Sequence, residues 1–296
     1  MPSQRDRQKQ PSSSFRLLIE YDGTRYSGWQ RQAPPRPKGG GPREAGAAPQ
    51  GSKELGAEPK EPVVKTIAGA IGHVMHHAGL QIRNFKGAGR TDAGVHALGQ
   101  VAHVHLEEPM MASDLQYILE RGLPYDIAVP SVEPCQAGFD ARHDAVSRTY
   151  LYRVTLRKSA FSKHSTWWPK LPLDLRLIED TWPLFEGNRS MAAFADLEEG
   201  EDANCQIYSC QTDRDGHLLL LRVTARFFLK RQVRRMVGAV VNCAMDRADV
   251  ARLREDLAKP GPESAMHWAE LAAPASGLFL ERVDYRGDRG DARRNS

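Results

Sequence analysis

The stretch that decides the fold is Gly87-Ala88-Gly89-Arg90-Thr91-Asp92-Ala93-Gly94-Val95-His96-Ala97. Its first eight residues hold three glycines, one arginine and one aspartate, and the run from Gln100 to Leu106 alternates as a strand does. Glycines let a backbone approach another group closely. The pattern therefore predicts a tight loop that presents Asp92 and leads directly into a strand.

On its own residues this loop has three open interpretations. Asp92 can cap a short helix after a simple turn, because threonine and aspartate are favoured there. Gly-Ala-Gly-Arg can instead cradle a phosphate, although its spacing matches neither the dinucleotide-binding fingerprint nor the P-loop. That interpretation requires a helix after the loop, whereas the alternating residues predict a strand. The third interpretation is a catalytic loop built around the carboxylate.

Length and composition bound the class of protein. With 296 residues, 41% of them hydrophobic, the chain is long enough for one large domain or two modest ones. No apolar run approaches the roughly 18 residues of a membrane span, and the polar N-terminus predicts no secretory signal. We therefore expect an intracellular protein, in the cytoplasm or the mitochondrial matrix.

Cysteine and histidine spacing predicts no metal site. The four cysteines form no C-x-x-C pair, so reduced thiols are expected. His73, His76 and His77 have the spacing of ligands on one helix turn, but a solvated helix face is the preferred interpretation because no acid or thiol stands nearby in sequence. The net charge of +4 permits a nucleic-acid partner without requiring one.

Three segments are expected to lie outside the folded domains. Residues 1–14 are polar and basic, which fits either a disordered tail or the remnant of a mitochondrial presequence. Residues 33–62 consist mainly of Pro, Gly, Ala, Lys and Glu, and predict a disordered surface insertion that cannot bury enough apolar area to offset its ordering entropy. Residues 287–296 form a second polar tail.

The remaining sequence predicts an N-terminal domain over residues 15–138 and a C-terminal domain over residues 139–286. Tyr26 to Gln32 carries two aromatic rings and two amides, which can stack on bases or pack locally. Ser113 and Gln116 are expected to form a capping box. The elements expected are strands at 15–21, 100–106, 150–156, 218–223 and 277–285, helices around 67–75, 113–122, 175–182, 231–244 and 268, and irregular segments at 124–134 and 196–202.

The densest basic patch runs from Arg226 to Arg235, with five cations, two phenylalanines and no acid. Helical spacing of the apolar residues that follow places a helix start near Arg231. Cations at a helix start oppose the helix dipole. Either an external anion such as phosphate shares this site, or the patch is a solvated charged face.

Five blocks of residues occur in order between Phe15 and about Tyr285. They are Tyr21-Asp22-Gly23-Thr24 with Gly28-Trp29-Gln30-Arg31-Gln32, Gly89 to His96, Phe139-Asp140-Ala141-Arg142 with Arg148-Thr149-Tyr150, Phe228 to Gly238, and Gly277-Leu278-Phe279-Leu280 with Val283-Asp284-Tyr285. Together they resemble the motifs of the TruA family of tRNA pseudouridine synthases. The chain departs from the family pattern in the 33–62 insertion and at Lys230-Arg231, where many members carry histidines.

The resemblance implies an α+β fold of two domains related by a pseudo-two-fold axis, each with a split βαβ antiparallel sheet, flanking a basic active-site cleft. It also implies a homodimer that converts uridine to pseudouridine in tRNA, in the anticodon arm, without a cofactor or metal. The alternative is a protein on the same fold that binds RNA or the ribosome without turnover. Asp92, Tyr150 and Arg234 are all present, which favours the enzyme.

The resemblance further implies a role for each site residue. Asp92 is the catalytic carboxylate, and Arg234 orients it and keeps it ionised. Tyr150 stacks on the flipped uracil, and its hydroxyl can help remove the C5 proton. Arg90 holds a phosphate or enters the space that the base leaves. The other residues implied to bind the tRNA are Thr91, Arg142, Lys230, Arg231 and Arg235.

Overall fold

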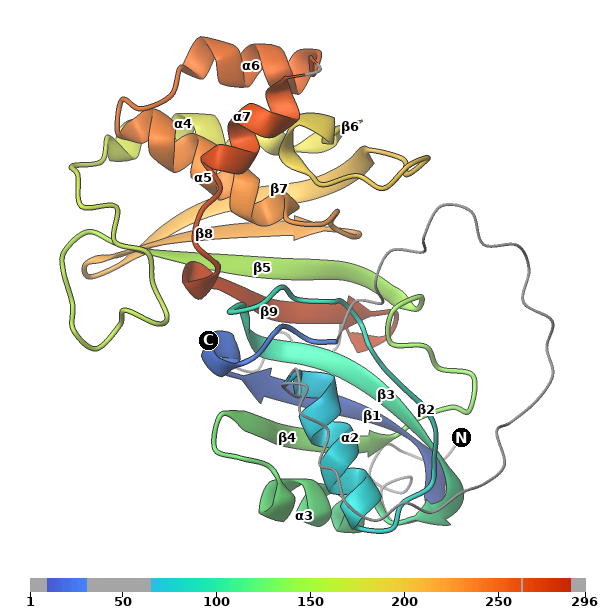
Figure 1. The fold of residues 1–296 in the computed structure, drawn as a ribbon. Coiled ribbons are helices and arrows are strands. Elements are labelled where there is room, and N and C mark those ends of the chain that lie inside the picture. The colour runs from blue at the N-terminus through green and yellow to red at the C-terminus, as the bar shows by residue number, and fades with distance from the viewer. Residues whose placement is uncertain (1–9, 31–64, 262, 289–296) are drawn as a thin grey trace, which may run out of the picture.

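A nine-stranded sheet runs through the computed structural model, which describes residues 10–30, 65–261 and 263–288. All pairings in it are antiparallel except the one between β3 and β9, near the middle of the sheet (Figure 1). The order is β4 (Ile127–Pro134), β1 (Ser12–Tyr21), β3 (His96–Met110), β9 (Leu278–Tyr285), β5 (Ala145–Thr155), β8 (Leu218–Ala225), β7 (Asn204–Asp215) and β6 (Gly187–Ser190), and β2 (Ile82–Gly87) pairs with β3.

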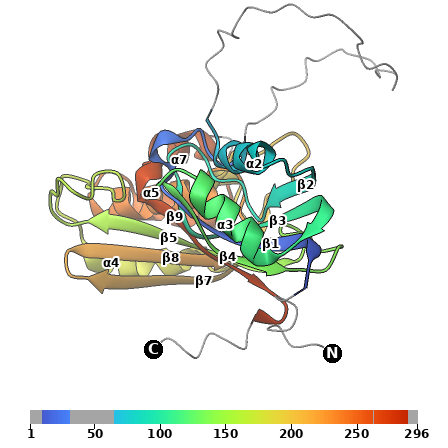
Figure 2. The same cartoon turned by 90° about the horizontal axis from the view of Figure 1, so that it is seen from below.

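Helices pack beside both halves of the sheet, which gives a mixed α/β fold with a large, mostly antiparallel sheet (Figures 1 and 2). The helices α2 (Ile67–His77) and α3 (Ala112–Gly122) accompany β1 to β4, and α4 (Leu175–Thr181), α5 (Gln232–Ala244), α6 (Val250–Ala258) and α7 (Ser264–Glu270) accompany β5 to β8. Short 3-10 turns are η1 (Gly23–Arg25), η2 (Trp182–Phe185), η3 (Ala192–Phe194) and η4 (Ala275–Gly277). Within the described ranges, no helix has the length and apolar character needed to cross a bilayer.

The strand β3 connects the two halves. It pairs with β1 and β2, and its first two residues, His96 and Ala97, pair in parallel with Phe279 and Leu280 of β9. The ring of His96 also stacks on Phe279 at 4.6 Å between centroids. The last strand of the chain is therefore placed beside the residues that directly follow the glycine-rich loop.

The helix α5 is almost wholly buried, because apolar residues recur around most of its circumference. Arg231 precedes it in a left-handed conformation with φ of 62°, and the buried amide of Gln232 accepts a hydrogen bond from the backbone N–H of Leu229 at 2.8 Å. Gly238 lets the backbone of residues 271–273 pack directly on the helix.

Several expected boundaries are wrong. Residues 124–134 are not merely connective, because β4 forms there; it lies at the sheet edge, where its two prolines are tolerated. The capping box is absent, since α3 begins at Ala112 and its N-cap, Met111, makes no side-chain bond. The strand β5 begins at Ala145, earlier than predicted, and the sequence patterns did not predict β2, β6, β7 or α6.

Both predicted tails are shorter than expected where the structure describes them. The strand β1 begins at Ser12, inside the predicted N-terminal tail. At the other end, Asp288 pairs with Arg16 of β1 at 2.8 Å, so Gly287 and Asp288 belong to the folded part. Residues 1–9, the insertion at 33–62, and residues 289–296 lie outside the described residues.

The substitution Gly238→Ala tests the packing of α5. The added methyl group would lie 2.1 Å from the carbonyl oxygen of Leu271, so α5 and residues 271–273 must separate. We expect the free energy of unfolding to fall by about 2 kcal/mol, in the range of overpacked cores, in a urea titration. The control is Gly72→Ala on α2, whose methyl group meets nothing within 4 Å and which we expect to be neutral or stabilising. Equal effects at the two positions would contradict this account.

Candidate active site

The loop between β2 and β3 is held in place by hydrogen bonds from the first and third strands. The amide nitrogen of Gln100 donates to the carbonyl oxygen of Gly89 at 2.8 Å, and the hydroxyls of Tyr21 and Thr91 are 2.8 Å apart. The backbone N–H of Val95 donates to the carbonyl of Asp92 at 3.2 Å, which closes a turn. No helix follows the loop, so its interpretations as a helix cap or as a nucleotide-binding loop are both wrong.

The motif near the N-terminus packs against this loop. Gly28 has φ of 93°, and an added Cβ there would lie 2.4 Å from the carbonyl oxygen of Thr91. Trp29, 1% exposed, donates its backbone N–H to the same carbonyl at 3.1 Å. Of the two interpretations of Tyr26 to Gln32, local packing therefore holds for Tyr26 and Trp29, both buried, while Arg31 and Gln32 lie outside the described residues.

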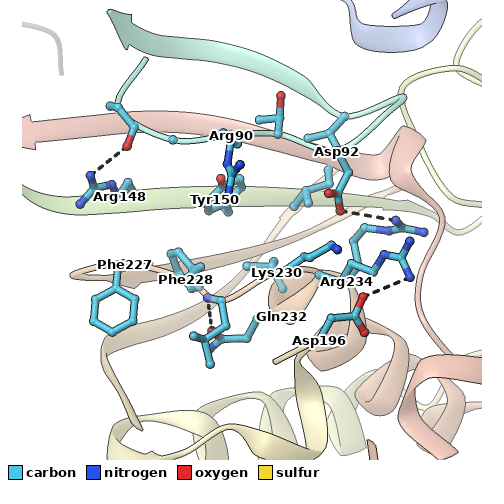
Figure 3. Close-up of a pocket in the computed structure, with 18 of the residues that line it drawn as sticks. Arg90, Asp92, Arg148, Tyr150, Asp196, Phe227, Phe228, Lys230, Gln232 and Arg234 are labelled. Atoms are coloured by element: carbon cyan, nitrogen blue, oxygen red, sulfur yellow. Dashed lines mark hydrogen bonds and ion pairs between the residues drawn. The ribbon is translucent and has the colours of Figure 1, made fainter. Parts of the chain in front are cut away.

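Asp92 and Arg234 face each other across a pocket (Figure 3). A terminal nitrogen of Arg234 lies 3.8 Å from a carboxylate oxygen of Asp92, an ion-pair distance that is longer than a hydrogen bond. The Nε–H of Arg234 donates to the carbonyl oxygen of Ala273 at 2.8 Å, which fixes the direction of the guanidinium. Both side chains are partly exposed, so a ligand can reach the pair.

Tyr150 lies in the same pocket, on β5, with its ring edge-on to Phe228 at 5.2 Å. Its hydroxyl points toward Gly89, whose added Cβ would lie 3.9 Å from it. Burial, together with the negative charge of Asp92, raises the pKa of Tyr150 to about 12. Tyr150 is therefore a neutral phenol at physiological pH and a poor base.

Arg148, two residues before Tyr150 on β5, is 8% exposed. Its guanidinium donates to three backbone carbonyls, those of Ala88 at 2.9 Å, Arg142 at 2.6 Å and Arg226 at 2.7 Å. Burial lowers its pKa. The side chain joins the loop before β3, the segment before β5 and the end of β8, although the sequence assigned it no role of its own. The sequence feature that could have identified Arg148 is its position two residues before Tyr150, which places both side chains on one face of the strand.

The pocket has a volume of about 620 Å³. Seven of the residues that line it are arginine or lysine and four are acidic. An excess of cations suits a polyanionic ligand. The charged lining residues are Arg90, Asp92, Arg142, Arg148, Asp196, Glu198, Glu201, Arg226, Lys230, Arg231 and Arg234.

Eight of the nine candidate site residues named from the sequence line the pocket, and Arg235 is the exception. Arg90, Arg142, Lys230 and Arg231 are exposed at the pocket, and Arg231 pairs with Asp196 at 3.2 Å. Thr91 also lines the pocket, but it is 7% exposed and its hydroxyl is already bonded to Tyr21.

Arg235 does not line the pocket, which corrects its expected role as a tRNA contact. Its side chain is 5% exposed and forms an ion pair with Asp196. It also donates to the carbonyl oxygens of Ala195 at 2.9 Å and Ala265 at 3.3 Å. Arg235 lies on a face of α5 that packs into the core, so its side chain stabilises the fold and is not available to bind tRNA.

The sequence patterns did not identify Asp196, Phe227, Phe228 or Leu278 as lining residues. Asp196 lies in a stretch predicted only as an acidic loop, and nothing in its spacing indicates that it pairs with cations of α5. His73, His76 and His77 are exposed on α2, as the preferred interpretation of a solvated helix face predicts. No group of three or more metal-ligating side chains was found among the residues that the structure describes.

The profile of the tRNA pseudouridine synthase family matches residues 50–144 and 183–286. The chain is also similar to "tRNA pseudouridine synthase A" of Afipia carboxidovorans, with 34% identity over 92% of this chain and 99% of the relative. The proteins of that name from Bartonella bacilliformis and Dictyoglomus thermophilum are 31% and 34% identical, over 92% and 76% of this chain and 99% and 92% of the relatives.

The chain belongs to the TruA family of tRNA pseudouridine synthases. The resemblance seen in its motifs is thereby confirmed. Within this TruA-family chain, both matched regions contribute to the pocket, because Asp92 lies in the first and Arg234 in the second.

His96, at the end of the glycine-rich loop, makes stability of this TruA-family protein depend on pH. Its Nδ1 accepts from the backbone N–H of Gly23 at 3.2 Å, and its Nε2 lies 3.2 Å from the carbonyl of Ser276. Burial lowers the pKa of His96, although the nearby Asp22 acts in the opposite direction. The neutral ring, donating through Nε2, satisfies both contacts.

The free energy of unfolding should therefore fall as the pH drops below about 6.5, because the unfolded chain then binds a proton that folded His96 does not. Above that pH this contribution is fully present. We expect His96→Gln to reduce the slope of stability against pH by up to about 1.4 kcal/mol per pH unit, the limit for one proton, in urea titrations between about pH 5 and 7. His77→Gln, at an exposed position of α2, is the control, and a wild-type slope in His96→Gln would exclude this role.

Proposed function

We propose that Asp92 is the catalytic carboxylate of a tRNA pseudouridine synthase, the activity by which this family is named. The observation that carries the proposal is the ion pair of Asp92 with Arg234 beside buried Tyr150 in one cationic pocket. A carboxylate, an arginine that orients it and an aromatic ring are what isomerisation of a flipped uridine requires.

The reaction breaks the C1′–N1 bond of uridine, rotates the freed uracil and joins C1′ to C5, with loss of the C5 proton. N1 gains a proton in its place, so the product is an isomer of uridine and the reaction is redox neutral. A carboxylate on the sugar side of the base can add to C1′, stabilise the cationic sugar or remove a proton from C2′. Each of these needs a correctly oriented carboxylate, and the guanidinium of Arg234 lies 3.8 Å from a carboxylate oxygen of Asp92.

Tyr150 supplies the surface on which the extruded uracil stacks. Extruding a base costs a few kcal/mol, and stacking on an aromatic ring recovers part of that cost. The ring of Phe228, perpendicular to that of Tyr150 with the centroids 5.2 Å apart, helps to hold the tyrosine in place. With a pKa of about 12, the phenol keeps its proton at neutral pH, so we propose stacking as its main role and assign no base chemistry to it.

The tRNA backbone is held by the exposed cations of the pocket, which are Arg90, Arg142, Lys230 and Arg231. Arg90 is placed two residues before Asp92 on the same loop, so it either binds a phosphate next to the target or fills the space left by the uracil. We propose the anticodon arm of tRNA as the target, by analogy with the family.

We also propose a two-domain organisation and a homodimer. Residues 15–138 contain most of β1 and all of β2, β3 and β4 with α2 and α3, and residues 139–286 contain β5 to β9 with α4 to α7. A pseudo-two-fold axis between them would place the pocket in the cleft that they share. Support comes from the lining residues, which are drawn from both halves.

The variant Asp92→Asn keeps the size of the side chain and removes its charge. We expect turnover to fall at least about a thousandfold, the order expected for an essential catalytic group, while tRNA affinity changes little. Pseudouridine is measured by carbodiimide mapping of tRNA after single-turnover reactions, and affinity by filter binding. Turnover at the wild-type rate would exclude Asp92 as the catalytic carboxylate.

The pair Tyr150→Phe and Tyr150→Leu separates stacking from hydroxyl chemistry. We expect the phenylalanine variant to stay within about tenfold of wild-type turnover and the leucine variant to lose a further ten- to hundredfold, because only leucine lacks the ring face. Both rates come from the same single-turnover assay. Equal, near-total losses in the two variants would instead assign the main role to the hydroxyl.

A further inference from the structure

A second basic surface lies on the segment between β5 and α4, at residues 157–173. This segment contains Arg157, Lys158, Lys163 and Lys170 and no acidic residue, so it alone carries an excess of four positive charges, equal to the net charge of +4 of the whole chain. All four side chains are exposed. None of them forms an ion pair with a carboxylate in the described part of the chain.

Exposed aromatic side chains are interleaved with these cations. Phe161 is 100% exposed and Trp168 36% exposed. A fully solvated phenylalanine gains nothing from the fold, whereas an aromatic ring among lysines is the composition of surfaces that bind single-stranded nucleic acid.

The backbone of the segment is pinned, so these side chains project from fixed positions. The N–H of Trp167 donates to the carbonyl of Arg153 at 2.9 Å, and the N–H of Thr155 donates to the carbonyl of Trp167 at 2.8 Å. The ring of Trp167 packs edge-on to Tyr152, and the hydroxyl of Thr166 closes the turn onto Ser162 at 2.9 Å. Trp167 thus anchors the segment while its neighbour Trp168 faces outward.

The segment lies at the end of the sheet that carries the glycine-rich loop. The backbone of His164 lies against the ring of His96, which belongs to that loop. Figures 1 and 2 both place the segment after β5 at the same end of the sheet as the dark red turn η4, and η4 in turn contacts Gly94 of the loop through Ala275. An RNA that enters the pocket can therefore reach this surface.

We propose that residues 157–170 form a second RNA-binding surface, which holds tRNA outside the catalytic pocket. Lys158, Lys163 and Lys170 bind phosphates of the tRNA backbone, and Phe161 stacks on an unpaired base. The proposal rests on the proposed function, because it takes tRNA as the ligand. Charge complementarity selects RNA over a second copy of this surface, since a segment with four cations and no acidic residue repels itself.

The triple variant Lys158→Ala, Lys163→Ala, Lys170→Ala tests the phosphate contacts. Each lost phosphate contact lowers the slope of log affinity against log salt by about one, so we expect a decrease of roughly two to three and at least tenfold weaker binding of full-length tRNA at low salt. The matched control is Arg247→Ala, Arg254→Ala, Lys259→Ala, three exposed cations at α6. Its tRNA affinity and salt slope should equal those of the wild type.

Phe161→Ala tests the stacking contact, and we expect tRNA binding to weaken by roughly tenfold with an unchanged salt slope. Phe161→Trp should restore the affinity, and Tyr117→Ala, at an exposed aromatic of α3, should not alter it. Wild-type tRNA binding by both the triple variant and Phe161→Ala would overturn the proposal. A difference in oligomeric mass between these variants and the wild type, measured by sedimentation, would also overturn it, because the surface would then be a contact between protein subunits.

These outcomes are separable from a failure of the proposed function. If the second surface is wrong, the wild-type enzyme still forms pseudouridine, while the segment variants bind tRNA as it does. If the proposed function is wrong, the wild-type protein forms no pseudouridine in tRNA, whatever the segment variants bind.

Discussion

The site depends on the parallel pairing of β3 with β9. His96 and Ala97 pair with Phe279 and Leu280, so the loop that precedes β3 and the turn η4 that precedes β9 meet at one end of the sheet. Ala273, just before η4, accepts the hydrogen bond that directs Arg234 toward Asp92. A shift of this register by one residue would turn every side chain of β9 to the opposite face and remove Ala273 from Arg234. The geometry of the ion pair therefore follows from strand pairing.

A second constraint is the buried charge of Arg148. Removing a guanidinium from water is costly, and three backbone carbonyls from three segments compensate part of that cost. Backbone carbonyls satisfy its hydrogen bonds without neutralising its charge. Arg148 consequently joins the glycine-rich loop to β5 and β8, and it also adds positive potential to the pocket that it lines.

The sequence predicted the glycine-rich loop, β1, α2 and α5 well because each has a clear periodicity or a motif with few alternatives. It failed for β4, whose two prolines are unusual inside a strand, and for β2 and β6, which are short and partly exposed. It also failed for β7, where burial alternates only in the first half and the last residues are exposed. For the site, Asp92, Tyr150 and Arg234 came from motif order. Contacts between residues far apart in the sequence, such as Asp196 with Arg231, cannot be inferred from residue spacing and are seen only in the folded structure.

Asp196 explains why a run of cations is tolerated at the start of α5. One of the two sequence interpretations placed an external anion there, because arginines oppose the positive end of the helix dipole. The fold supplies an internal one, since the carboxylate of Asp196 pairs with both Arg231 and Arg235. This divides the basic run between two tasks. Arg235 is buried and structural, and Arg234 faces Asp92. Lys230, which forms no ion pair with a carboxylate within the described ranges, remains exposed at the pocket.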